Sequence, residues 1–391
     1  MVAKWQRLII VAGFALAGCA AVSSLNPLNW WGDSGAGPKP APLAEIISTF
    51  TLNPAWRASV GGAGAYLFVP ALGVDTVYAA SADGTLAAFD TGTGAQRWRV
   101  QASRTGLSAG VGADKTTVVV ATIKGEVLAF DPSGKEKWKA QVTSEVLAPP
   151  LVTEGSVLVR SNDNRIFSFD AANGKRLWTY QRSAPALVLR NFGGLVAGRG
   201  LIYAGFPGGK LATLSIGNGS LRWEGTVAQP KGATELERIA DISSAAALGE
   251  REVCAVAFQG RAACFDALTG QPAWSRELSS HAGMVVDSRY AFVADDRSAI
   301  VALVAGTGSS LWKQDKLLHR GLSAPLSLGR AVIVGDYQGF LHAISREDGS
   351  FIGRAQTDGG WIAAPPQALQ VRGGEGFLVQ TRSGGIFAFL I

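Results

Sequence analysis

The sequence predicts an all-β protein, an eight-bladed β-propeller with four antiparallel strands in each blade. A short unit, in which a turn glycine is followed four residues later by tryptophan, recurs along most of the chain. The units are about 40 residues apart, which is the length of one propeller blade. The 49 glycines and an apolar content of 47% suit a turn-rich protein with a large buried core.

The recurring unit is clearest in residues 88–98, where a strand ends near Phe89 and a tight turn leads to Trp98. The turn glycine, Gly94, is free to take a positive φ. A seventh unit has Gly353 in place of tryptophan. A blade cannot bury both faces alone, so we expect each indole to lie between two stacked blades. The six complete units are Gly94/Trp98, Gly134/Trp138, Gly174/Trp178, Gly219/Trp223, Gly270/Trp274 and Gly308/Trp312.

The eighth blade is expected to take strands from both ends of the chain. Residues 383–389, the last turn followed by an apolar run, are not followed by an outer strand, since the sequence ends at Ile391. An additional tryptophan, Trp56, lies near the other end. We therefore predict that an N-terminal strand around Trp56 completes the C-terminal blade and closes the ring without an open edge. Two smaller all-β domains are the alternative, which the even spacing disfavours.

The start of the chain has the features of a bacterial lipoprotein. Residues 1–18 combine basic Lys4 and Arg7 with an apolar stretch too short to span a bilayer, which indicates a signal peptide. The sequence Leu-Ala-Gly-Cys at 16–19 resembles a lipobox, so Cys19 is predicted to carry the lipid anchor. An ordinary secretory signal with an incidental cysteine is the alternative.

Residues 19–45 are predicted to be the lipidated cysteine and a flexible tether, because Ser, Gly, Pro and Asn dominate them. The propeller is expected over residues 46–391. Ala20 follows the cysteine, where an Asp would resemble an inner-membrane retention signal. We therefore expect a protein held by its lipid in the cell outer membrane and facing the periplasm.

Charge and histidine content argue against two classes of site. The formal net charge is +6, but the basic residues are scattered, so we expect no nucleic-acid partner. The three histidines, His281, His319 and His342, lack the spacing of metal ligands, so we predict no metal site.

Cys254 and Cys264 flank a predicted hairpin turn. If that turn has three residues and a bulge at Gly260, the two cysteines lie opposite each other on paired strands, about 4.5 Å apart at Cα. The periplasm would oxidise such a pair to a disulfide. Two buried thiols are the alternative.

Two intervals between units are longer than the others, which indicates insertions at residues 181–200 and 225–247. Extra length on a rigid ring is a frequent place for binding. In the first insertion, alternation would put Leu187 and Leu189 on one face, with Arg190 beside them as an exposed anchor for a partner. Core leucines and a solvated arginine are the alternative. The second insertion is either a short helical turn or an extended acidic loop.

The motif Ala-x-Asp-x-x-Thr-Gly-x-x-x-Trp at residues 88–98 resembles the repeat of the pyrroloquinoline-quinone-type propellers. Together with the lipobox, it resembles the propeller lipoproteins of the outer-membrane β-barrel assembly machinery. Loop motifs at 187–190, 234–241 and 317–325 agree with that family. The resemblance implies a non-enzymatic scaffold that binds the periplasmic POTRA domains of the central barrel subunit. It also implies help in folding and inserting outer-membrane proteins, with unfolded clients as further partners.

Carried over residue by residue, the partner contact of this family falls on Leu187, Leu189, Arg190 and Asp241. The second acidic position of the family loop is Ser243 here, so one charge of that contact is absent.

A quinoprotein dehydrogenase shares the repeat and is the alternative function. Such enzymes resemble one another in an axial cofactor pocket, a bound calcium, an Asp general base and two adjacent cysteines. This sequence has no adjacent cysteines, and its acidic residues lie in or beside turns, where structural roles dominate. We therefore expect no enzymatic activity and no cofactor.

Overall fold

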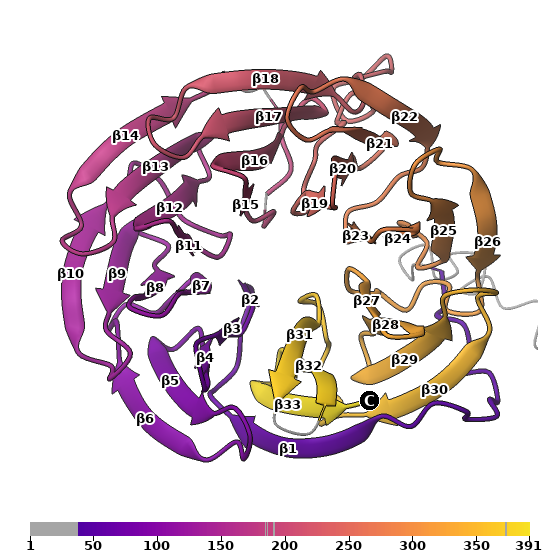
Figure 1. The fold of residues 1–391 in the computed structure, drawn as a ribbon, viewed down its shortest axis with the longest axis horizontal. Helices are drawn as coiled ribbons and strands as arrows, with labels where there is room; N and C mark the ends of the chain where they lie inside the picture. The colour runs from indigo at the N-terminus through magenta and orange to yellow at the C-terminus, as the bar shows by residue number, and fades with distance from the viewer. Residues whose placement is uncertain (1–37, 184, 186, 191, 372–373) are drawn as a thin grey trace, which may run out of the picture. The chain divides into compact units, whose positions relative to one another are not determined.

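The computed structural model describes residues 38–391 except 184, 186, 191 and 372–373, and its compact unit runs from Pro40 to Ile391. Eight β-sheets stand around a central axis in a closed ring (Figure 1). No helix occurs in the described part of the chain. The predicted all-β, eight-bladed propeller is therefore confirmed.

Each sheet is one blade, and its strands run in chain order from the axis to the rim, except that the rim strand of the eighth blade is the N-terminal β1 (Asn53–Ser59). The first blade contains β3 (Ala71–Leu72), β4 (Thr76–Ala80), β5 (Thr85–Asp90) and β6 (Gln96–Gln101). The second contains β7 (Ala109–Ala113), β8 (Val118–Ala121), β9 (Glu126–Phe130) and β10 (Glu136–Gln141), with β2 (Leu67–Phe68) added in parallel to β7. The third contains β11 (Leu151–Thr153), β12 (Ser156–Ser161), β13 (Arg165–Asp170) and β14 (Arg176–Gln181). The fourth contains β15 (Val196–Gly198), β16 (Leu201–Phe206), β17 (Lys210–Ser215) and β18 (Leu221–Thr226).

The remaining blades follow the same order. The fifth contains β19 (Ala247–Leu248), β20 (Glu252–Val256), β21 (Arg261–Asp266) and β22 (Pro272–Glu277). The sixth contains β23 (Gly283–Val286), β24 (Tyr290–Ala294), β25 (Ile300–Val304) and β26 (Ser310–Gln314). The seventh contains β27 (Leu326–Leu328), β28 (Ala331–Gly335), β29 (Phe340–Ser345) and β30 (Phe351–Gln356). The eighth contains β31 (Gln367–Val371), β32 (Gly374–Gln380), β33 (Gly385–Leu390) and, at the rim, β1 (Asn53–Ser59).

Burial explains the sequence pattern of the strands. The middle strands are covered on both faces by neighbouring blades, so β4 and β12 are buried along their whole length. A strand covered on both faces is expected to have a continuous apolar run. The rim strands alternate instead, as in β6, because only one of their faces packs on the blades.

The N-terminal strand closes the ring as predicted. β1 pairs antiparallel with β33, with Ser59 opposite Gly385 at one end and Asn53 opposite Leu390 at the other. The final blade is therefore hydrogen-bonded from both ends of the chain, and Figure 1 shows β1 at its rim.

Each indole of the repeat packs on the turn glycine of the next blade. At Gly174, whose φ is +74°, an added Cβ would lie 2.6 Å from the Trp138 ring. The Trp138 indole N–H also donates to the carbonyl of Ala171 in that turn, at 3.0 Å. The repeat thus fixes the blades to one another by packing and by one hydrogen bond. The other pairs are Trp56 and Gly94, Trp98 and Gly134, Trp178 and Gly219, Trp223 and Gly270, Trp274 and Gly308, and Trp312 and Gly349.

The seventh blade lacks this tryptophan because the N-terminal segment takes its place. A Cβ on Gly353 would lie 2.3 Å from the carbonyl oxygen of Phe50. The backbone N–H groups of Thr49 and Phe50 donate to the carbonyl of Ile352 at 2.9 and 2.8 Å. In the eighth blade no turn joins β33 to β1, so an indole at position 353 of the seventh blade would have no turn to pack on. Glycine at position 353 instead leaves room for the incoming N-terminal segment.

Residues 40–52, which we call the strap, lie along the seventh blade before entering β1. The Ala41 N–H donates to the carbonyl of Leu318 at 2.9 Å, and Arg354 Nη1 donates to the carbonyl of Ala44 at 2.9 Å. The compact unit that begins at Pro40 thus includes the strap. The predicted signal peptide and Cys19 lie outside the described residues.

Candidate partner-binding site

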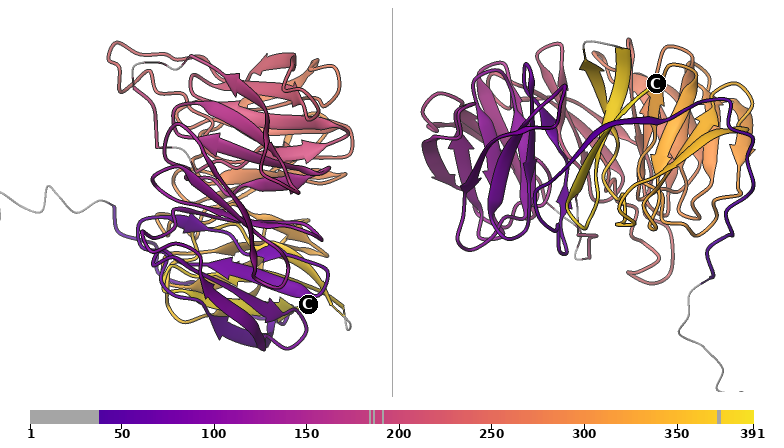
Figure 2. Two further views of the ribbon diagram at one scale, coloured as in Figure 1. Left: turned by 90° about the vertical axis from the view of Figure 1, so that its left-hand side faces the viewer. Right: turned by 90° about the horizontal axis from the view of Figure 1, so that it is seen from below.

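Both insertions lie on one face of the ring. Each blade has four antiparallel strands, so its last strand ends on the face of the ring where its first strand begins. Every connection from the rim of one blade to the axis of the next therefore lies on this face, which we call the connector face. The first insertion joins β14 to β15 and the second joins β18 to β19, so topology puts them there together. In the right-hand view of Figure 2, the second insertion projects below the ring.

A buried carboxylate joins the two insertions. The backbone N–H of Leu189 donates to Asp241 Oδ2 at 2.7 Å, and that of Gly208 donates to Asp241 Oδ1 at 3.0 Å. Asp241 is only 2% exposed, although we expected its side chain to face the partner. Its carboxylate holds the first insertion in place, since both oxygens already accept hydrogen bonds from the backbone.

The two leucines of the first insertion have different environments. Leu187 is 40% exposed and presents its side chain to solvent. Leu189 is half-buried and lines the mouth of a cavity on the ring axis, which we call the axial cavity. The expected alternation does not hold, because this segment is not part of a strand.

Arg190 is fixed although it is exposed. Its guanidinium forms an ion pair with Glu145 at 3.2 Å and lies 5.8 Å from the ring centres of both Tyr66 and Phe192. Glu145 is itself held by a 3.0 Å hydrogen bond from the Asn162 amide. The loop therefore offers a preordered cation beside an exposed leucine.

Arg160 belongs to this site, and the sequence reasoning missed it. It is 5% exposed, stacks over the Phe206 ring at 4.9 Å, and has no hydrogen-bond partner for Nη1 or Nη2 among the described residues. Burial lowers the pKa of Arg160 to about 10, and the charge of Asp241 opposes that shift. The available signal was an arginine within the apolar run of β12.

The second insertion contains a single capped turn at residues 234–238, so of the two predicted forms the short helical turn is found. Glu237 Oε2 accepts the backbone N–H groups of Ala233 and Thr234, and the Glu237 N–H donates to Thr234 Oγ1. This reciprocal arrangement is a capping box. Hydrogen bonds from the Thr234 and Ala233 backbones lower the pKa of Glu237.

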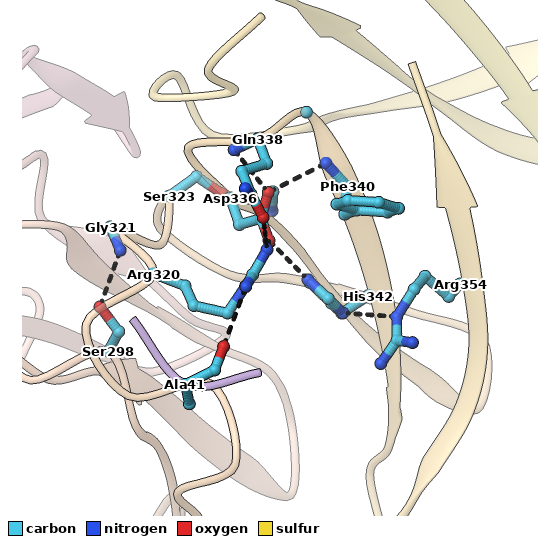
Figure 3. A network of polar contacts seen from close by, with 12 residues as sticks. Ala41, Ser298, Arg320, Gly321, Ser323, Asp336, Gln338, Phe340, His342 and Arg354 are labelled. Atoms are coloured by element: carbon cyan, nitrogen blue, oxygen red, sulfur yellow. Dashed lines mark hydrogen bonds and ion pairs between the residues drawn. The ribbon is translucent and has the colours of Figure 1, made fainter. Parts of the chain in front are cut away.

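The third loop motif contains a buried ionic network at the strap (Figure 3). Arg320 donates from Nε to Asp336 Oδ2 at 2.7 Å and from Nη1 to the carbonyl of Ala41 at 3.0 Å. His342 Nε2 contacts the same carboxylate oxygen at 3.1 Å, and Arg354 Nε donates to His342 Nδ1 at 3.3 Å. His342 is therefore a neutral ring that donates to Asp336, and burial lowers its pKa. The network fixes the strap.

Comparison with known proteins identifies the family. The family model described as outer membrane protein assembly factor BamB matches residues 82–314. The outer membrane protein assembly factor BamB of Bordetella pertussis is 42% identical over 98% of this chain and 96% of its own length. The chain belongs to the BamB family. The BamB protein of Burkholderia pseudomallei is 43% identical over 90% of this chain and 91% of its own length.

Solved structures agree with this family and fold. The crystal structure of BamB from Moraxella catarrhalis matches with a TM-score of 0.79 at 25% identity, covering 87% of this chain and all of that chain. A quinohemoprotein alcohol dehydrogenase from Comamonas testosteroni matches with a TM-score of 0.70 at 14% identity, covering 86% of this chain and 76% of that chain. At that identity, the second likeness shows the propeller fold alone.

The axial cavity of this BamB-family chain does not suit a calcium-bound quinone. The cavity has a volume of about 950 Å³, and no Asp or Glu is among the described residues that line it. Calcium sites are built from oxygen ligands, chiefly carboxylates. No group of three or more His, Cys, Asp or Glu side chains placed to hold a metal occurs in the described part of the chain.

Two further features complete the description of this BamB-family chain. A disulfide joins Cys254 and Cys264, which are directly paired between β20 and β21 with Cα atoms 4.0 Å apart. Over the described residues, no helix has the length and apolar character needed to cross a membrane.

Proposed function

We propose that the chain is a non-enzymatic scaffold lipoprotein of the outer-membrane β-barrel assembly complex. In this proposal it binds the POTRA domains of the central barrel subunit and assists the folding and insertion of outer-membrane proteins. The observation that carries the proposal is the first insertion, in which exposed Leu187 lies beside Arg190 on a loop held by Asp241. An apolar anchor with a fixed cation is typical of a binding hot spot. Because Arg190 is already paired with Glu145, little of its side-chain entropy would be lost on binding.

The experiment is recovery of the barrel subunit with tagged protein from detergent-solubilised outer membranes. Leu187→Ala and Arg190→Ala should each reduce that recovery about tenfold or more, as expected for hot-spot residues. Arg261→Ala is the matched control for Arg190, because Arg261 also forms a surface ion pair at 3.2 Å, with Glu277. Leu311, 45% exposed on β26, is the control for Leu187. Wild-type recovery with both site variants would contradict the proposal.

We also propose that Cys19 carries the lipid that holds the protein at the outer membrane, facing the periplasm. The family supports an outer-membrane location, and the lipobox supports the anchor. Cys19→Ser should release the protein into the soluble periplasmic fraction. A variant that stays in the outer-membrane fraction when the barrel subunit is depleted would contradict lipid anchoring.

A further inference from the structure

The axial cavity is a candidate ligand site whose mouth includes Leu189 and Arg190 of the partner-binding loop. Its volume of about 950 Å³ is at the upper end of the ~300–1,000 Å³ typical of small-molecule pockets. The innermost strands and the connections before them supply an apolar wall, which includes Leu72, Val111, Leu151 and Met284. An apolar ligand would therefore bury most of its surface here.

Prolines are frequent in the wall of the cavity. Six of the described lining residues are prolines, which have no backbone N–H. A hydrocarbon chain needs no hydrogen-bond partner, so it can lie along this wall without leaving a polar group of its own unpaired. The lining thus suits an aliphatic chain. The prolines are Pro70, Pro149, Pro150, Pro325, Pro365 and Pro366.

Basic side chains gather at one mouth of this cavity. Arg190, His281 and Arg382 are the basic residues of the described lining, and all three lie in loops of the connector face. Arg190 pairs with Glu145, and His281 contacts Asp296 at 2.7 Å. With no carboxylate in the described lining, the mouth is complementary to an anionic group.

Arg382 is the basic group whose charge is left for a ligand. Its guanidinium lies over the Trp361 ring at 4.3 Å, and its buried Nε has no hydrogen-bond partner among the described residues. No ion pair joins Arg382 to any carboxylate in the described chain, although its sequence neighbours Ser383 and Thr381 both donate hydrogen bonds to Asp358. The stacked ring holds the guanidinium at the mouth without neutralising it.

We propose that the axial cavity binds a single-chain anionic amphiphile, with the hydrocarbon chain along the apolar wall and the carboxylate on Arg382. A fatty acid has this chemistry. The site is separate from Leu187 in the partner-binding loop, so the two proposals can fail independently.

Laurate is the probe, used below its micellar concentration and without detergent. The protein is the full mature chain with Cys19→Ser, because attached acyl chains and detergent would compete for the cavity. Calorimetry and Trp fluorescence report binding. We expect one laurate per chain, and no binding of dodecyltrimethylammonium, which has the same chain length and a cationic head.

Variants locate the site. Arg382→Glu should weaken laurate binding about tenfold or more, through loss of a charge-assisted contact. Ala363→Phe, which fills part of the cavity, should weaken laurate binding although Arg382 is intact. Arg289→Ala is the matched control and should leave binding unchanged. Arg289 also stacks on an aromatic ring, 4.8 Å from the centre of Tyr290, but it does not line the cavity. Circular dichroism checks the fold of each variant.

Four results would overturn the proposal: no laurate binding, equal binding of the cationic amphiphile, wild-type affinity in Arg382→Glu, or binding of an acidic apolar peptide without laurate. Each is distinguishable from failure of the partner proposal, which is read from recovery of the barrel subunit.

Discussion

Leu189 and Asp241, 52 residues apart in the sequence, are joined by a 2.7 Å hydrogen bond from the backbone of one to the carboxylate of the other. The bond links the two insertions of the ring. Arg190 follows Leu189 in the chain and Leu187 precedes it by two residues, so their positions depend on Asp241, which is itself buried.

Asp241→Ala should therefore weaken partner binding without removing a partner contact. The substitution leaves the N–H groups of Leu189 and Gly208 unpaired, which costs about 1–3 kcal/mol for each buried group unless the loop opens. We expect the loop around residues 187–190 to open, with faster amide exchange there and about tenfold lower recovery of the barrel subunit. Asp241→Asn keeps one acceptor oxygen and should have a smaller effect. Unchanged exchange in Asp241→Ala would contradict this role.

Gly174→Ala should destabilise the ring more than Gly155→Ala. The two glycines have φ angles of +74° and +73°, so the backbone strain is the same, about 1–2 kcal/mol. A Cβ on Gly155 meets open space, whereas one on Gly174 collides with the Trp138 indole. We expect Gly174→Ala to lose about 2 kcal/mol more of the free energy of unfolding. Equal losses in chemical denaturation would mean that the indole contact contributes little.

Stability should fall as the pH is lowered below 6.5, the ordinary pKa of histidine, and His342 should cause part of this fall. Burial lowers its folded pKa below the ordinary value of 6.5. Between the folded pKa of His342 and 6.5, the unfolded chain binds more protons than the folded chain. The contribution of His342 to stability is therefore complete above pH 6.5 and is lost as the pH falls through the folded pKa. The pKa of Asp336 is also lowered: burial raises it, but hydrogen bonds from His342 and Phe340 outweigh that effect. Its contribution is lost only below the ordinary Asp value of 3.8.

The variant His342→Gln should flatten the pH dependence of stability below pH 6.5, measured as the midpoint of thermal unfolding. Gln retains a donor and an acceptor for the neighbouring Asp336 and Arg354. If the variant keeps the full slope, other groups are responsible.

Alkylation should modify neither Cys254 nor Cys264 in the unfolded protein until a reductant is added. The disulfide closes a short loop, and replacing both cysteines by alanine should lower the free energy of unfolding by about 2–3 kcal/mol. Mass spectrometry of the periplasmic protein gives the answer directly. Alkylation of both thiols before reduction would show that the pair is reduced in the cell.

The regular part of the fold could be predicted because it depends on contacts that repeat. The spacing of Gly94 and Trp98 recurs at nearly constant intervals, since each indole meets the turn of the next blade in the same geometry. The same rule predicted that Trp56 belongs to a strand that completes the ring. A contact made several times leaves a period in the sequence.

The irregular part could not be predicted, because each of its contacts occurs once. Gly353 is explained only by the carbonyl of Phe50, which lies about three hundred residues away in the chain. Asp241 was expected at the surface, since no local pattern shows that two backbone N–H groups cover its carboxylate. Single long-range contacts of this kind decide the shape of the candidate site.

The strap also determines how the ring bears mechanical load. β1 comes first in chain order, so tension from the N-terminal side would peel it from β33 one hydrogen bond at a time. The contacts at Ala41 and Ala44 precede β1 and transfer that load to Arg320, in the connection before β27, and to Arg354 in β30. Tension on the preceding chain is therefore borne before it reaches the seam that closes the ring.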